Sequence, residues 1–150
     1  LLEAVALAGF VRLREAMVEV ATRNADDPVQ QMRDAGAAYV ALAVEKPALT
    51  HLMFGGAIDP KQASEDYCAT SQKAYESLLA IIENGRRAGV YKAAEPDELA
   101  LVVWSSAHGL AMLIAGGQLS DQTLSNDQIQ HMVSVVSDGL LHGLLQSDRD

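Results

Sequence analysis

The chain has 150 residues, of which 49% are hydrophobic and only 5% aromatic, and its formal net charge is −9. The hydrophobic share excludes an intrinsically disordered chain, and the negative charge argues against direct nucleic-acid binding, because phosphate contacts need clustered lysine and arginine. Cys68 is the single cysteine, so the chain forms no internal disulfide, which fits a reducing cytoplasm.

The first half of the sequence predicts three helices. Residues 2–23 place apolar side chains at helical spacing. Asp27 is the predicted N-cap of a second helix over 28–45, with a proline in its first turn. Pro47 ends that helix, because the residue before a proline avoids helical geometry, and it begins a short helix over 47–54.

The second half predicts three longer helices. The first runs over 60–88, where Gly89 supplies a C-cap. The second covers 96–116, with proline and acidic side chains at its start and a pair of glycines at its end. A polar loop over 118–125 precedes a last helix over about 126–146. The fold class is therefore predicted to be all-α, a single domain of about six helices.

The helix predicted over 96–116 is the centre of this fold. It is apolar on almost every side, which is typical of a helix that is buried all round or that spans a membrane. The stretch is short for a span and carries Ser105, Ser106 and His108, so we expect a packed interior helix and no membrane segment. Trp104 is the only tryptophan, and it shares one helix face with His108 four residues later.

Two segments of this sequence resemble one known family. Residues 39–55, a helix broken at Lys46-Pro47 and a short helix ending in Met53-Phe54-Gly55, resemble a segment of tetracycline-repressor-type (TetR-family) regulators. Trp104 followed at the fourth position by His108-Gly109 resembles the motif that names the Trp-His-Gly subclass of their C-terminal domains. The number, order and lengths of the predicted helices agree with such a domain over nearly the whole chain.

The resemblance implies a regulatory role for residues 1–150. In the family, an N-terminal helix-turn-helix domain reads DNA, and a C-terminal helical domain binds a small effector and forms a homodimer. The helix-turn-helix part has no counterpart here, so we expect a missing upstream part and contact with DNA only through it. The implied protein is a cytoplasmic transcriptional regulator, a repressor in which the effector moves the first helix of this domain and releases the operator.

A mostly apolar pocket is expected between the second, fourth and central helices. The residues proposed to bind the effector are Tyr39, Phe54, Tyr75, Leu78, Ile82, Trp104, His108 and Met112. No lysine or arginine lies between Glu95 and Gln118, so a neutral or cationic, largely hydrophobic effector is favoured. The alternative, in which Trp104 and His108 only pack in the core, stays open.

The homodimer is expected to form through the central and last helices. The residues proposed for its interface are Leu110, Ile114, Ile129, Val133, Val136, Leu140 and Leu144. Gly139 and Gly143 are four residues apart on the last helix, a spacing that allows helices to approach closely. A dimerisation module without a small ligand is the competing hypothesis.

Metal binding and catalysis are not expected. The four histidines and Cys68 show no pair at a chelating spacing of three or four residues along a helix. The sequence also contains no glycine-rich phosphate loop and no nucleophile elbow. We therefore predict no cofactor, no metal and no enzymatic activity, with a small helical enzyme or carrier as the least favoured alternative.

Overall fold

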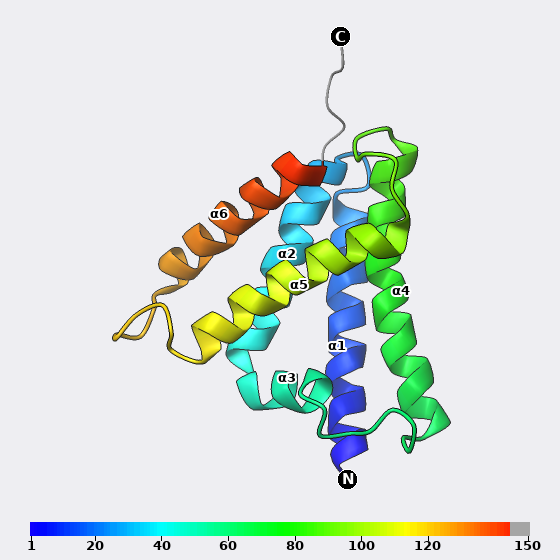
Figure 1. The fold of residues 1–150 in the computed structure, drawn as a ribbon, viewed down its shortest axis with the longest axis vertical. Coiled ribbons are helices and arrows are strands. Elements are labelled where there is room, and N and C mark those ends of the chain that lie inside the picture. Colours follow the sequence, from blue (N-terminus) through cyan, green and yellow to red (C-terminus); the bar gives the residue numbers. More distant parts are fainter. Residues whose placement is uncertain (145–150) are drawn as a thin grey trace.

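The computed structural model describes residues 1–144, and within this range the chain forms six helices and no strand. The predicted all-α class and the order of the six helices are confirmed. Residues 145 and 146, which were predicted to end the last helix, lie outside the described residues. The helices are α1 (Leu2–Arg23), α2 (Pro28–Glu45), α3 (Pro47–Phe54), α4 (Glu65–Arg87), α5 (Pro96–Ala115) and α6 (Asn126–Leu144) (Figure 1).

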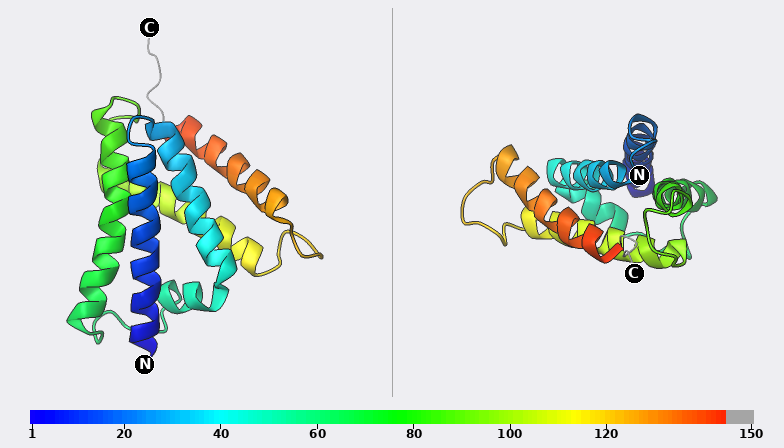
Figure 2. Two further views of the ribbon diagram at one scale, coloured as in Figure 1. Left: turned by 180° about the vertical axis from the view of Figure 1, so that it is seen from behind. Right: turned by 90° about the horizontal axis from the view of Figure 1, so that it is seen from above.

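The six helices pack around one shared core. The long helices α1 and α4 run side by side, and α2 packs against α1 (Figures 1 and 2). α5 crosses these three helices obliquely and contacts α2 and α4, while α6 packs on α2 and α5. Val40 of α2 and both Ile81 and Ile82 of α4 are almost completely buried in the core.

Local signals in the sequence explain most helix ends. The side chain of Asp27 accepts a hydrogen bond from the backbone N–H of Gln30 at 3.0 Å, so its predicted role as an N-cap is confirmed. Gly89 follows α4 with a φ of +70°, a left-handed conformation that glycine adopts without strain. At the start of α6, Ser125 and Gln128 exchange hydrogen bonds of 3.2 and 2.8 Å, which form a capping box.

The predicted start of the fourth helix at Pro60 is wrong. Residues 58–64 form a loop, in which the carboxylate of Asp59 accepts from the backbone N–H of Lys61 at 3.0 Å. The helix begins at Glu65, because Ser64 caps it by accepting from the N–H of Tyr67 at 3.2 Å. The serine cap and the acidic first turn therefore set the boundary, and the proline belongs to the preceding loop.

The prediction that the central helix is buried on all sides is also wrong. Its inner face, formed by Leu99, Ala100, Val103 and Ala111, is at most 5% exposed. Its outer face is formed by Leu101, Val102 and Leu113, which are 67%, 43% and 45% exposed. By length and composition α5 is apolar enough to cross a membrane, as core helices of soluble proteins often are. The described chain covers one of its two apolar faces.

Candidate functional site

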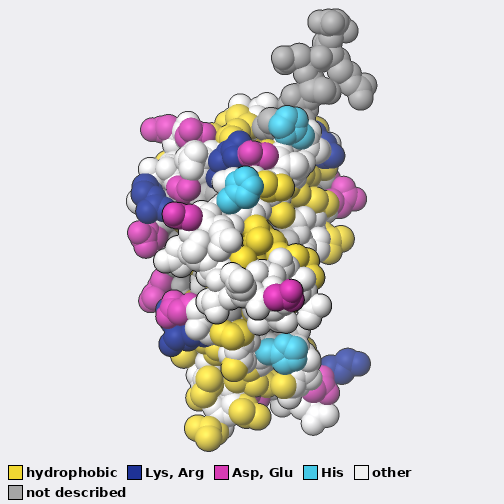
Figure 3. All heavy atoms as spheres, turned by 90° about the vertical axis from the view of Figure 1, so that its left-hand side faces the viewer, with side chains coloured by type: hydrophobic (Ala, Val, Ile, Leu, Met, Phe, Trp, Pro, Cys, Tyr) yellow, Lys and Arg dark blue, Asp and Glu magenta, His cyan; other side chains and the backbone are white. Residues whose placement is uncertain are grey.

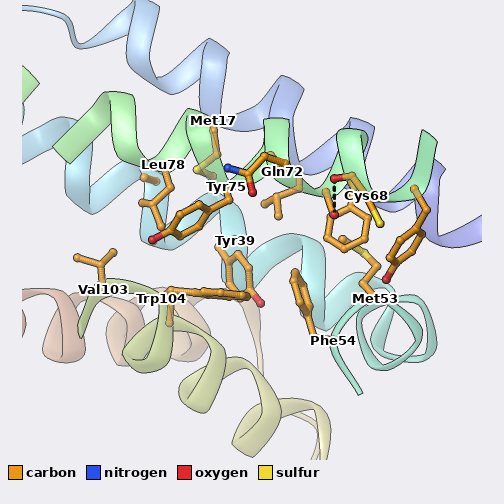
Figure 4. Close-up of a pocket in the computed structure, with 18 of the residues that line it drawn as sticks. Met17, Tyr39, Met53, Phe54, Cys68, Gln72, Tyr75, Leu78, Val103 and Trp104 are labelled. Atoms are coloured by element: carbon orange, nitrogen blue, oxygen red, sulfur yellow. Dashed lines mark hydrogen bonds between the residues drawn. The ribbon is translucent and has the colours of Figure 1, made fainter. Parts of the chain in front are cut away.

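A cavity of about 530 Å³ lies between the α1–α4 pair and the group formed by α2, α3 and α5 (Figure 4). Its size is in the range of sites that hold small molecules. The wall is mostly apolar, and it draws on five helices and the loop before α4. The lining residues are Phe10, Leu13, Met17, Ala35, Gly36, Tyr39, Met53, Phe54, Pro60, Tyr67, Cys68, Ser71, Gln72, Ala74, Tyr75, Leu78, Val103, Trp104 and Ala107.

Aromatic rings dominate this wall. Six of the seven aromatic residues of the chain line the cavity, and only Tyr91 does not. The rings meet edge to face, with Phe54 at 5.4 Å from Trp104 and at 5.5 Å from Phe10 between ring centroids. Edge-to-face contacts are a favourable arrangement for aromatic pairs. The cavity therefore has an aromatic floor, formed by Phe54 of α3 and Trp104 of α5.

The polar groups of the wall come mainly from α4 and carry no charge. No aspartate, glutamate, lysine or arginine is among the lining residues. Ser71 donates to the carbonyl oxygen of Cys68 at 3.0 Å, and the amide nitrogen of Gln72 donates to the carboxylate of Glu76 on the same helix at 3.4 Å. The exposed side chains of Gln72 and Cys68 lie on its open side. The interior offers a few neutral polar atoms and a large apolar surface.

Tyr39 turns its hydroxyl away from this interior. The hydroxyl is 2.8 Å from Nδ1 of His108, a residue that does not line the cavity. Burial raises the pKa of Tyr39 to about 12, against an opposing contribution from Trp104, so the phenol stays protonated at neutral pH. Burial, and secondarily the charge of His51, lower the pKa of His108, so the imidazole is neutral. The pair is an uncharged bond between α2 and α5.

A second hydrogen bond joins α4 to the start of α5. The hydroxyl of Tyr75 donates to the carboxylate of Asp97 at 2.6 Å, and this bond is the main cause that raises the pKa of Tyr75 to about 12. The ring of Tyr75 lies 6.1 Å from that of Trp104, which is 37% exposed. Tyr75 and Trp104 therefore border the cavity from opposite helices where it meets the surface.

The middle of the chain is similar to a known domain. Residues 32–136 match the family described as "Tetracyclin repressor-like, C-terminal domain". The chain belongs to this TetR-like family. A solved structure with the description "Structure of a protein with unknown function from Rhodococcus sp. RHA1" is 26% identical, with a TM-score of 0.83 over 97% of this chain and 72% of that chain. A search of the curated proteins found no match.

The structure of this TetR-like domain brings together five of the eight residues that were predicted to bind an effector. The five that line the cavity are Tyr39, Phe54, Tyr75, Leu78 and Trp104. Ile82 is fully buried in the core, and His108 stands behind Tyr39. Met112 lies further along α5, outside the lining. For these three residues the structure shows no access to the cavity, and effector binding by the other five stays a prediction.

Sequence reasoning missed the contribution of α1. Phe10, Leu13 and Met17 form one wall, although the predicted pocket was bounded by the second, fourth and central helices. Their spacing of three and four residues is the same for a cavity wall and for a filled core, so periodicity could not distinguish the two. The available signal was compositional, because two of the missed wall residues, Phe10 and Tyr67, are among the few aromatics.

The residues predicted for the dimer interface lie inward in this TetR-like domain. Four of the seven are buried within the chain, namely Leu110, Ile114, Val133 and Leu144. The other three are partly buried against the core, namely Ile129, Val136 and Leu140. They complete the packing of α5 and α6 on α2. The exposed apolar side chains on these two helices are instead the outer face of α5 and Val135, which is 58% exposed.

Proposed function

We propose that this TetR-like domain binds a small, neutral, largely hydrophobic effector in the aromatic cavity and holds two copies of a transcriptional regulator together. The observation that carries the proposal is the cavity of about 530 Å³ with its apolar, aromatic wall. Membership of the family supports a ligand-binding and dimerisation role. In the complete regulator, a helix-turn-helix domain would contact DNA, and the effector would release a repressor from its operator in the cytoplasm.

The absence of charged side chains from the described cavity lining favours a neutral effector. A charged group that leaves water needs an opposite charge or several hydrogen bonds in its new site, because an unpaired buried charge is very costly. The wall offers phenol, amide and hydroxyl groups instead. This narrows the neutral or cationic effector expected from the sequence to a neutral one.

The place of α1 in the wall supports a route from effector to DNA. Phe10, Leu13 and Met17 would touch a bound molecule, so occupancy would act directly on α1. In the TetR family, the first helix of this domain is the one that effector binding moves. Trp104 and His108-Gly109 support the finer assignment to the Trp-His-Gly subclass, with Trp104 at the cavity and His108 bonded to Tyr39.

The second part of the proposal is a dimer through the outer face of α5 and the adjacent side of α6. On the face that Figure 3 shows, charged side chains are most frequent along one edge, and hydrophobic side chains lie over the rest of that face with a few charged ones among them. Burial of Leu101, Leu113 and Val135 against a second copy would remove exposed apolar surface from water. The glycines Gly109 and Gly139 are exposed on the same two helices and would allow close approach.

Thermal unfolding with a panel of neutral, cationic and anionic aromatic compounds tests the proposal. Neutral compounds are expected to raise the melting temperature, because a ligand at a hundred times its Kd stabilises the native state by about 2.7 kcal/mol. Ala74→Leu, which fills the cavity, should abolish this shift. Ala80→Leu is the matched control, since Ala80 is exposed on the same helix.

The outcomes separate the competing functions. If no compound shifts the melting temperature while the chain remains dimeric, the domain is a dimerisation module without a ligand. If anionic compounds bind best, the argument from the uncharged wall is wrong. If Ala74→Leu and Ala80→Leu respond alike, binding takes place elsewhere.

A further inference from the structure

Most polar side chains in the wall of the aromatic cavity come from one helix, α4. Four of them follow one another at intervals of three, one and three residues, which places them on one face of the helix. At a rise of about 1.5 Å per residue, the row is roughly 10 Å long. This row, the α4 stripe, consists of Cys68, Ser71, Gln72 and Tyr75.

The walls that face the α4 stripe are largely apolar. Phe54 and Trp104 lie across the cavity from the stripe (Figure 4). The hydroxyl of Tyr39 is bonded to Nδ1 of His108, and Trp104 carries one indole N–H. Apart from these two groups, the described side chains of the facing walls contain only carbon, hydrogen and sulfur. The cavity therefore has one polar edge and one apolar side.

The hydrogen bonds already present leave the α4 stripe with free acceptors. The hydroxyl of Ser71 donates to a backbone carbonyl one turn earlier at 3.0 Å, and that of Tyr75 donates to the carboxylate of Asp97 at 2.6 Å. The amide nitrogen of Gln72 donates to the carboxylate of Glu76 at 3.4 Å, so its carbonyl oxygen stays available. Because an oxygen keeps lone pairs when its hydrogen is engaged, the oxygens of Ser71, Gln72 and Tyr75 can each accept from a ligand.

The other polar groups of this wall do not reverse the balance. The thiol of Cys68 donates to the carbonyl oxygen of Pro60 at 3.7 Å, and its sulfur is a weak acceptor. The hydroxyl of Tyr67, which also lines the cavity, can donate as well as accept, and Gln72 keeps one amide hydrogen. The described side chains of the α4 wall therefore accept hydrogen bonds at more positions than they donate them.

We propose that the α4 stripe selects neutral effectors with two or more hydrogen-bond donors, hydroxyl or N–H groups, along one edge of an aromatic body. The donor edge would lie against Ser71 and Gln72, and the apolar body would pack on Phe54 and Trp104. This inference rests on the proposed function and specifies its ligand class.

Selectivity would come from the cost of displacing water from the stripe. The open side of the cavity lies at the exposed side chain of Gln72, so solvent reaches the stripe when no effector is bound. An effector that takes the place of water either donates to the oxygens or leaves them unpaired, and unpaired polar groups lower the affinity. The penalty should be larger at the half-buried Ser71 than at Gln72, where water still has access.

Displacement of the neutral fluorescent probe N-phenyl-naphthylamine tests this inference. The two competitors are phenylresorcinol, a biphenyl with two meta hydroxyl groups on one ring, and its counterpart with fluorine in place of both hydroxyls. Both are uncharged at neutral pH and have similar shapes, but only the hydroxyls donate hydrogen bonds. In a plain apolar cavity the difluoro compound would bind more tightly, because it gives up less hydration. At the α4 stripe the dihydroxy compound should bind at least as tightly.

Variants of Ser71 and Gln72 locate the contact. Ser71→Ala should weaken the dihydroxy compound about fivefold, the effect of one hydrogen bond, and leave the difluoro compound unchanged. It should fold, since alanine favours a helix. Gln72→Met keeps the length of the side chain without its carbonyl oxygen. It should weaken the dihydroxy compound only about twofold, because water can replace the amide as acceptor at this exposed position.

The chain offers a matched control for each variant. Ser77 donates to a backbone carbonyl three residues earlier on α4, as Ser71 does, but lies outside the cavity lining. Gln30 of α2 donates to a carboxylate four residues later, as Gln72 does, and also lies outside the lining. Ser77→Ala and Gln30→Met should therefore leave both affinities unchanged.

Two results would overturn the inference without touching the proposed function. One is tighter binding of the difluoro compound to the wild type, and the other is an equal response of the dihydroxy compound to Ser71→Ala and Ser77→Ala. In either case, displacement of the probe still supports an effector site in the aromatic cavity. If neither compound displaces the probe, both the inference and the proposed function are wrong.

Discussion

The two faces of α5 have similar composition and opposite surroundings. Ala100 and Ala111 on the inner face are completely buried, whereas Leu101 on the outer face is 67% exposed. The exposed residues are larger and more hydrophobic than several of the buried ones. Hydrophobicity alone therefore does not show which face meets the core. It shows that both faces are apolar, and the described chain covers one of them.

The largest expected difference between the two faces is in stability. Leu99→Ala on the inner face should lower the free energy of unfolding by about 2–5 kcal/mol, because it removes a buried side chain and leaves a cavity. Leu101→Ala should change the stability of the isolated chain by no more than about 0.5 kcal/mol. Urea unfolding over a series of protein concentrations measures both. Equal losses for the two variants at low concentration would show that the faces do not differ.

Dimer formation should depend on the outer face of α5 and not on the inner face. Leu101→Glu combined with Leu113→Glu places two charges on the outer face, and it should weaken the dimer by at least about 2 kcal/mol, or roughly thirtyfold in Kd. Leu119→Glu, in the exposed loop after α5, is the control and should leave the dimer intact. Analytical ultracentrifugation gives the Kd. A wild type that is monomeric at micromolar concentration would contradict the dimer proposal.

The hydrogen bond between Tyr39 and His108 should matter more than the one at the cavity opening. Tyr39→Phe should cost about 1–1.5 kcal/mol, since it leaves the half-buried imidazole without its partner. Tyr75→Phe should cost less, because water replaces the lost hydroxyl near the exposed carboxylate of Asp97. Chemical unfolding of both variants checks the order, and a larger loss for Tyr75→Phe would reverse our assignment of the buried and exposed bonds.

The smallest expected effect is the loss of the stability contribution of His108 at acidic pH. Burial lowers the pKa of His108 below its ordinary value of 6.5, so the unfolded chain binds more protons than the folded chain between the two pKa values. The contribution of His108 to stability is therefore complete above pH 6.5 and is lost as the pH falls from there through its folded pKa. The stability difference between wild type and His108→Gln should shrink on acidification, and a difference that grows would show the opposite shift.

The sequence was sufficient to predict the helices, but it did not show which face of each helix is buried in the core. Asp27, Pro47 and Gly89 act through local geometry, so the ends that they define were predictable from neighbouring residues. Pro60 misled because proline also suits the loop that precedes a capped helix, and Ser64 provided the cap. Helix ends depend on a few neighbouring residues, so the helices, and with them the all-α class, could be predicted from the sequence.

The cavity depended on information that periodicity does not contain. Trp104 was predicted as a wall residue because its ring offers apolar surface on the central helix, and Tyr75 because of its place on the fourth helix of a TetR-like domain. Leu13 and Met17 were missed because a core stripe and a cavity stripe have the same spacing. Gly36 gave no signal, since its place in the cavity wall depends on how the other helices pack around α2. Only the crossing of α5 over α2 distinguishes filled core from open site.

The fluorescence of Trp104 tests most directly the claim that the inner side of α5 borders an effector site. It is the only tryptophan of the chain and lines the cavity, so energy transfer to N-phenyl-naphthylamine reports binding there. We predict saturable transfer that is lost in Ala74→Leu and kept in Ala80→Leu. Transfer that rises without saturation, or that persists unchanged in Ala74→Leu, would contradict the account.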